Sequence, residues 1–291
     1  MAGLACSVHS ATAQQVQGPD DALVSYVNQF LTIDRVQFSA AVVLRVHVET
    51  CDGCASDGDP IDGTYAAAYR DNRYRIDMLL DDTRFPDVDT VVAFNGALFQ
   101  LHRRDESTLA LSTTDQASFG AAIPDPLVES LQFLYPLIDA APLTQLKLAS
   151  IRQDEEIAER LFAVTWVSVD NDGAVAVFPG GTLDGVSYVH RVRFRYVGSL
   201  LAPEIIERVE GERVLSKYSV NTYTTQTVGQ TMTVWPQTVS YRSYDEEGQV
   251  LAEFAFTIGS LTLDGTVSED LFTLDVAPAI VWNADEQQIE Y

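Results

Sequence analysis

The chain has 291 residues, 46% of them hydrophobic, so it can bury a sizeable core in one large domain or two modest ones. It carries 18 Lys and Arg residues against 42 Asp and Glu residues, a formal net charge of -24. Such an acidic surface repels phosphates and anionic lipid head groups, which argues against nucleic acid and bare anionic membrane as partners. No stretch reaches the roughly 18 uninterrupted apolar residues of a spanning helix, so we expect no integral membrane protein.

Residues 1–19 have features of a secretion signal. Small side chains dominate the first fifteen residues, and Ala11, Thr12 and Ala13 form an A-x-A pattern of the kind that precedes signal-peptidase cleavage. The stretch lacks the basic segment and the long apolar run of a complete signal, so we interpret it as the remnant of one. We therefore expect residues 1–19 to be an export-signal remnant or a disordered leader, residues 20–291 to be the folded domain, and the product to reach the periplasm or cell envelope.

Two of the three cysteines, Cys51 and Cys54, lie together in a loop rich in Gly and Asp. A C-x-x-C pair can be a redox pair, half of a zinc site or a short disulfide. A redox pair of the thioredoxin kind begins a helix after a strand, and zinc needs two more ligands; neither context is present. We predict a disulfide that stabilises little, because the loop it closes is short. Whether Cys6 is lipidated stays open.

The chain after the leader begins with an amphipathic helix and continues with strands. Residues 22–34 place one apolar face at helical spacing. That face holds Leu23, Tyr26, Val27, Phe30 and Leu31. Residues 35–49 then alternate as a long half-buried strand, with Phe38, Val42 and Leu44 on its apolar side. Turn signals at 71–72 and 95–96 predict two hairpins.

Residues 124–141 form the apolar stretch around which we expect the strands to be arranged. Leu127, Leu131, Leu134 and Ile138 recur at helical spacing. Asp125 is the predicted N-cap, and Pro136 interrupts the helix near Tyr135. The helix is either an ordinary core helix of an α+β domain or the lid of a hydrophobic ligand cavity.

The second half of the chain predicts further strands, separated by turns at 171–173, 179–181, 211 and 247–248. A short amphipathic turn with an apolar anchor at Phe272 follows in the tail. The sequence has no nucleophile elbow, dinucleotide fingerprint or P-loop, and its four histidines lack metal-ligand spacing. We therefore expect neither an enzyme nor a bound cofactor or metal.

The order of these elements resembles the bacterial outer-membrane lipoprotein carrier and receptor family (LolA/LolB-like), which includes the N-terminal domain of the sigma-E regulator RseB. In that family a "dG-x-x-l-w" hairpin precedes the helix, and the last strand ends in "lp-d-x-l-F". Residues 95–99 and 267–272 stand at those places. The resemblance covers roughly Asp20 to Val276. It implies an α+β fold in which one large curved antiparallel sheet forms an open half-barrel and helices cover its concave face.

The resemblance also implies a non-enzymatic binding protein that holds an acyl chain, lipid or lipoprotein in a hydrophobic cavity. The residues expected to line it are Phe38, Val42, Leu44, Phe94, Phe99, Leu127, Leu131, Leu134, Tyr135 and Ile138. The alternative is an envelope protein-interaction or stress-sensing module of the RseB type that binds a polypeptide. An enzyme acting on envelope polymers is a third reading.

Overall fold

The structure is a computed structural model that describes residues 18–47, 58–71, 73–81, 90–103, 108–113, 125–127, 129–134, 164–183, 186–275, 280–283 and 288–290. The first half contains α1 (Pro19–Thr32), β1 (Arg35–Val46), β2 (Ile61–Arg70), β3 (Arg73–Leu80), β4 (Thr90–Phe94), β5 (Phe99–Arg103), β6 (Thr108–Ser112) and the 3-10 helix η3 (Glu129–Leu134). The second half contains β7 (Thr165–Val169), β8 (Gly173–Leu183), β9 (Val186–Val197), β10 (Leu200–Glu210), β11 (Arg213–Val228), β12 (Thr231–Tyr244), β13 (Val250–Leu263), the 3-10 helix η4 (Glu269–Phe272), β14 (Ile280–Asn283) and β15 (Gln288–Glu290).

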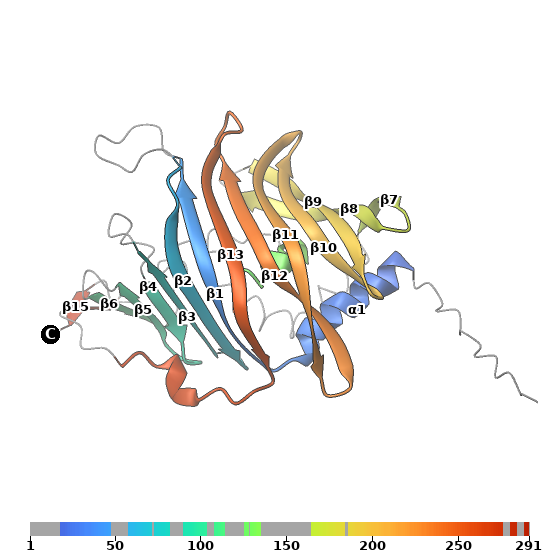
Figure 1. Ribbon diagram of the computed structural model, residues 1–291. Helices are drawn as coiled ribbons and strands as arrows, with labels where there is room; N and C mark the ends of the chain where they lie inside the picture. The colour runs from blue at the N-terminus through green and yellow to red at the C-terminus, as the bar shows by residue number, and fades with distance from the viewer. Residues whose placement is uncertain are drawn as a thin grey trace, which may run out of the picture.

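All the described strands belong to one open sheet of fifteen strands, in the order β15-β14-β6-β5-β4-β3-β2-β1-β13-β12-β11-β10-β9-β8-β7 (Figure 1). Neighbours in sequence pair with one another within each half, and the antiparallel β1–β13 pair joins the halves from Val36↔Leu263 to Val46↔Ala252. The prediction of one large sheet with few helices is confirmed. The prediction of a purely antiparallel sheet is wrong at one edge, where β14 from the tail pairs with β6 in parallel.

Both predicted hairpin turns are present. Asp71 joins β2 to β3 with a φ of 56°, in the left-handed region that Asp and Asn tolerate. Asn95 turns β4 into β5, and its side-chain oxygen accepts the N–H groups of Ala97 at 3.1 Å and Leu98 at 2.9 Å. The turn predicted at 179–181 lies instead inside β8, at a register shift against β9. Gly180 permits this because a Cβ there would collide with the carbonyl oxygen of Tyr188.

The inner face of the sheet is the face that carries Phe38, Val42 and Leu44 of β1, all buried. Helix α1 packs on this face against β10 (Figure 1). Its predicted apolar face is buried at Leu23, Tyr26, Val27 and Phe30. Phe30 meets Trp235 of β12 with ring centroids 4.7 Å apart. Gln29 fixes the same contact, because its amide donates to Val234 O at 2.6 Å and accepts from Val234 N at 2.8 Å.

The outer face differs between the two halves. Over β2 to β5 it is covered by the segment around η4, where Phe272 is buried as predicted and packs with Ala68 and Val267. Gln100 of β5 clamps this segment by donating to Phe272 O at 3.1 Å and accepting from Leu274 N at 2.9 Å. Over β9 to β13 the outer face carries cross-strand ion pairs. None of the helices in the described ranges is long and apolar enough to cross a membrane.

Candidate functional site

Residues 125–134, described except for Val128, lie across the inner face and are called the cover segment here. Their apolar side chains are buried: Leu127, Leu131, Phe133 and Leu134 are each at most 1% exposed. Phe133 packs against Phe178 of β8 with ring centroids 4.7 Å apart. An α-helix is predicted over 124–141, but residues 126–127 are a turn and Glu129–Leu134 form a 3-10 helix. Residues 135–141, with Tyr135 and Ile138, lie outside the described residues.

Asp125 begins the cover segment, and its carboxylate is fully buried. It accepts hydrogen bonds from the Tyr65 hydroxyl at 2.9 Å, from the Tyr69 hydroxyl and from Leu127 N–H at 2.9 Å. The Leu127 bond closes a local turn, but the η3 helix begins only at Glu129, so the predicted N-cap role of Asp125 is wrong. Burial, and next the neighbouring Asp125 charge, raise the pKa of Tyr65 and the pKa of Tyr69 well above the usual value, so both hydroxyls stay protonated donors.

The rest of the cover segment is tied down by side chains from three other elements. Tyr218 of β11 donates to Pro126 O at 2.5 Å, and Tyr26 of α1 donates to Ser130 Oγ at 3.4 Å. Arg208 of β10 donates from Nη2 to Gln132 Oε1 at 3.3 Å. The segment is thus apolar on the side that meets the sheet and hydrogen-bonded through side chains along its length.

The structure brings the described members of the expected cavity set into one buried cluster. The set is Phe38, Val42, Leu44, Phe94, Phe99, Leu127, Leu131 and Leu134. The three leucines belong to the cover segment, whereas Phe94 and Phe99 stack on each other on β4 and β5, far along the strand order from β8, β10 and β11 that the η3 helix contacts. The predicted disulfide between Cys51 and Cys54 lies outside the described residues.

Sequence reasoning missed the polar partners of the cover segment. Tyr65 and Tyr69 are four residues apart on β2, so alternation places both on the inner face, where their hydroxyls need partners. Arg208 falls on the inner face two residues after Ile206 in the same way. A charged residue at an inward position of an otherwise apolar strand face was the available signal.

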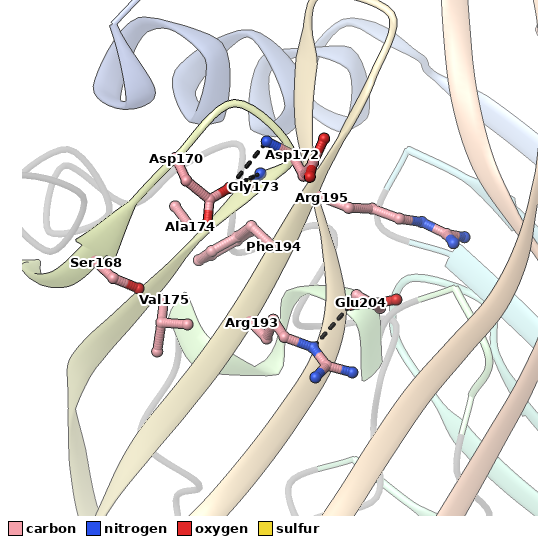
Figure 2. Close-up of a pocket in the computed structure, with 10 residues that line it drawn as sticks. All are labelled: Ser168, Asp170, Asp172, Gly173, Ala174, Val175, Arg193, Phe194, Arg195 and Glu204. Carbon is pink, nitrogen blue, oxygen red and sulfur yellow. Dashed lines mark hydrogen bonds and ion pairs between the residues drawn. The ribbon is translucent and has the colours of Figure 1, made fainter.

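A second feature is a hollow of about 400 Å³ at the edge of the sheet (Figure 2). It is lined by Ser168, Asp170, Asp172, Gly173, Ala174, Val175, Arg193, Phe194, Arg195 and Glu204. Arg193 pairs with Glu204 at 2.8 Å across it. Asp170 closes the β7–β8 turn by accepting from the N–H groups of Asp172 and Gly173 at 2.8 and 2.9 Å. Beside the hollow, β7 ends the sheet with Val167 64% and Val169 48% exposed.

Within the described ranges, no group of three or more His, Cys, Asp or Glu side chains is placed to hold a metal ion. The described part of the chain is thus one large open sheet with few helices, and its η3 helix packs against β8, β10 and β11.

The sequence matches no family model and no curated protein. Similar solved structures include a DUF1329 family protein from Desulfovibrio piger, at 10% identity and a TM-score of 0.49, covering 94% of this chain and 99% of that one. They also include a putative outer membrane lipoprotein-sorting protein domain from Vibrio parahaemolyticus, at 11% identity, a TM-score of 0.47 and coverage of 87% and 97%. An uncharacterized conserved protein from Thermus thermophilus has 7% identity, a TM-score of 0.36 and coverage of 89% and 96%.

Proposed function

We propose that this chain is an exported, non-enzymatic binding protein whose sheet curves as an open half-barrel and holds an acyl chain of a lipid or lipoprotein against its inner face. The observation that supports it is the cover segment. Four apolar side chains of that segment occupy the inner face, yet its helix is only six residues of 3-10 geometry, Glu129–Leu134. Such a short helix has little stability of its own, so its contacts hold it in place.

An acyl chain offers the inner face the same kind of contact that the cover segment provides. Each buried CH₂ contributes about 0.8 kcal/mol, so a sixteen-carbon chain gains on the order of 10 kcal/mol before its ordering and the displacement of the cover are subtracted. Four side chains hold the cover segment by hydrogen bonds: Tyr65, Tyr69, Tyr218 and Arg208. The strength of these bonds sets how readily an acyl chain displaces the segment.

The test is native mass spectrometry of the protein purified from its host, together with titration of a fluorescent fatty acid. Two neighbouring residues of β1 supply a matched pair of variants: Ala40 is buried on the inner face, and Ala41 is exposed on the outer face. We expect Ala40→Phe to weaken fatty-acid binding at least tenfold by filling inner-face space, and Ala41→Phe to leave it unchanged. A wild-type protein that carries no lipid and ignores the fatty acid contradicts the proposal.

The exposed edge strand β7 favours a second candidate function, the binding of an extended polypeptide that adds a strand to the sheet. Val167 and Val169 stand exposed at this edge, next to the hollow that holds Asp170, Asp172 and Glu204. The net charge of -24 suits a basic peptide.

Val169 offers a sharp test of strand addition. Asp170 N–H donates to Gly173 O at 2.9 Å, so the alternation of an antiparallel strand directs the Val169 N–H away from β8. Val169→Pro removes that outward donor, whereas Val169→Thr keeps it. We expect capture of a basic protein partner at low salt to be lost in the proline variant alone, and to fall in the wild type as salt screens the charges. Equal capture by both variants excludes the β7 edge.

A further inference from the structure

Arg208 is a buried cation with no carboxylate partner in the part of the chain that the structure describes. Its residue is 6% exposed, on the inner face of β10. Its Nη2 donates to Gln132 Oε1 at 3.3 Å, a neutral acceptor at the long end of hydrogen-bond distance. Its Nε has no hydrogen-bond partner within the described ranges. The guanidinium otherwise lies over the ring of Tyr188, 5.2 Å from the ring centroid.

Three arginines on the outer face of the same sheet, unlike Arg208, form ion pairs with glutamates. Arg191 lies 2.6 Å from Glu207, Arg193 lies 2.8 Å from Glu204 and Arg242 lies 2.8 Å from Glu253. These three exposed cations therefore have counter-ions. Among the described residues Arg208, which is buried and so needs a counter-ion most, hydrogen-bonds only the neutral amide of Gln132. An unpaired buried charge of this kind is compensated when an anion enters the site.

The surroundings of Arg208 fit the polar end of an amphiphile. Ser216, 3% exposed, stands opposite Arg208 in the β10–β11 register. Tyr241 lies close enough for the Arg208 charge to oppose the rise that burial causes in its pKa. The charge of Glu129, in the cover segment, also raises the pKa of Tyr241. Leucine and phenylalanine side chains of the cover segment and of β8 to β10 continue the inner face away from this polar end.

We infer that Arg208 is the head-group site of the protein and binds an oxyanion, a carboxylate or a phosphate, at the polar end of the acyl-chain ligand. The inference rests on the proposed function and adds the class of ligand to it. When the cover segment moves, Gln132 leaves the guanidinium, and its planar fork of N–H groups meets the oxyanion through two parallel hydrogen bonds. The bond forms in a site shielded from water, where such an interaction is stronger than at the surface.

The test uses three probes with the same sixteen-carbon chain: palmitate, hexadecyl phosphate and hexadecanol. Each displaces an uncharged fluorescent acyl probe from the full-length protein. We expect at least one anion to bind at least tenfold more tightly than hexadecanol, and the tighter anion identifies the carboxylate or the phosphate as the natural head group. Arg208→Met is expected to remove the preference, and Arg208→Lys to keep a reduced one. Arg191→Met, on the outer face of the neighbouring strand, is the control and should keep the full preference.

A thermal melt separates the head-group role from a structural one. Without ligand, Arg208→Met should be at least as stable as the wild type, because it removes an unpaired buried charge. Equal binding of all three probes by the wild type, or an anion preference that survives in Arg208→Met, overturns the head-group assignment and leaves acyl-chain binding intact. Failure of all three probes to bind overturns the proposed function together with this assignment.

Discussion

Raising the pH above about 10, the usual pKa of tyrosine, is expected to unfold this protein over a narrow interval. Burial is the first cause that raises the pKa of seven tyrosines above its usual value. They are Tyr26, Tyr65, Tyr69, Tyr74, Tyr218, Tyr223 and Tyr241. Most of these hydroxyls lie on the inner face around the cover segment, so the stability of the site and the stability of the fold depend on the same protons.

The sign follows from which state holds the protons more tightly. Below pH 10 both states are protonated, and the contribution of these tyrosines to stability is fully present. As the pH rises, the unfolded chain ionises first, and the contribution is lost towards the raised pKa values of the folded state. Each group removes about 1.4 kcal/mol per pH unit, so seven groups remove up to about 10 kcal/mol per unit. A typical stability of about 5–15 kcal/mol is then exhausted within one to two pH units.

Tyrosinate absorbance and circular dichroism, followed together during an alkaline titration, measure this transition. We expect the buried tyrosines to ionise in one step that coincides with loss of the sheet signal. Tyr74→Phe is the matched variant, because the Tyr74 hydroxyl is buried and has no hydrogen-bond partner among the residues that the structure describes. It should shift the transition to higher pH and raise the unfolding free energy at neutral pH by about 1 kcal/mol. Gradual ionisation around pH 10 with the sheet intact contradicts the prediction.

The sequence predicts those parts of the fold that local rules decide. The helical face of α1, the alternation of β1 and the Asn95 turn each depend on a few neighbouring residues, and each is confirmed. Contacts between residues far apart in the sequence decide the other parts of the fold. The return of β14 beside β6 cannot be predicted from the four residues of β14, and the interior strand position of Gly180 depends on the close approach of Tyr188.

The candidate site shows the same division. Periodicity predicts that Leu127, Leu131 and Leu134 are buried, because an apolar face needs a partner surface. It cannot predict that Asp125 meets Tyr65 and Tyr69, since the hydroxyls are 60 and 56 positions away along the chain. The α-helix is replaced by a 3-10 helix where Ser130 Oγ donates to Leu127 O at 2.5 Å, a side-chain bond that competes with the regular backbone pattern.

Replacing Asp125 by alanine is expected to loosen the cover segment and to tighten acyl-chain binding. The variant removes the buried carboxylate that accepts hydrogen bonds from two buried hydroxyls and from Leu127 N–H. Such a loss destabilises the covered state by about 3 kcal/mol. Because the apparent dissociation constant equals the intrinsic one divided by the fraction of open protein, the same change tightens binding by about two orders of magnitude.

Hydrogen exchange of the amides in residues 125–134 and titration of a fluorescent fatty acid measure the two effects on the same sample. Tyr69→Phe removes one donor and keeps the acceptor. It should therefore speed amide exchange and tighten fatty-acid binding, each by less than Asp125→Ala does. Asp172→Ala, at an exposed turn of the sheet edge, should move neither. Faster exchange combined with weaker binding would contradict this prediction. A segment that only blocks the site gives tighter binding when it is loosened, so weaker binding would mean that the cover segment is part of the core that shapes the site.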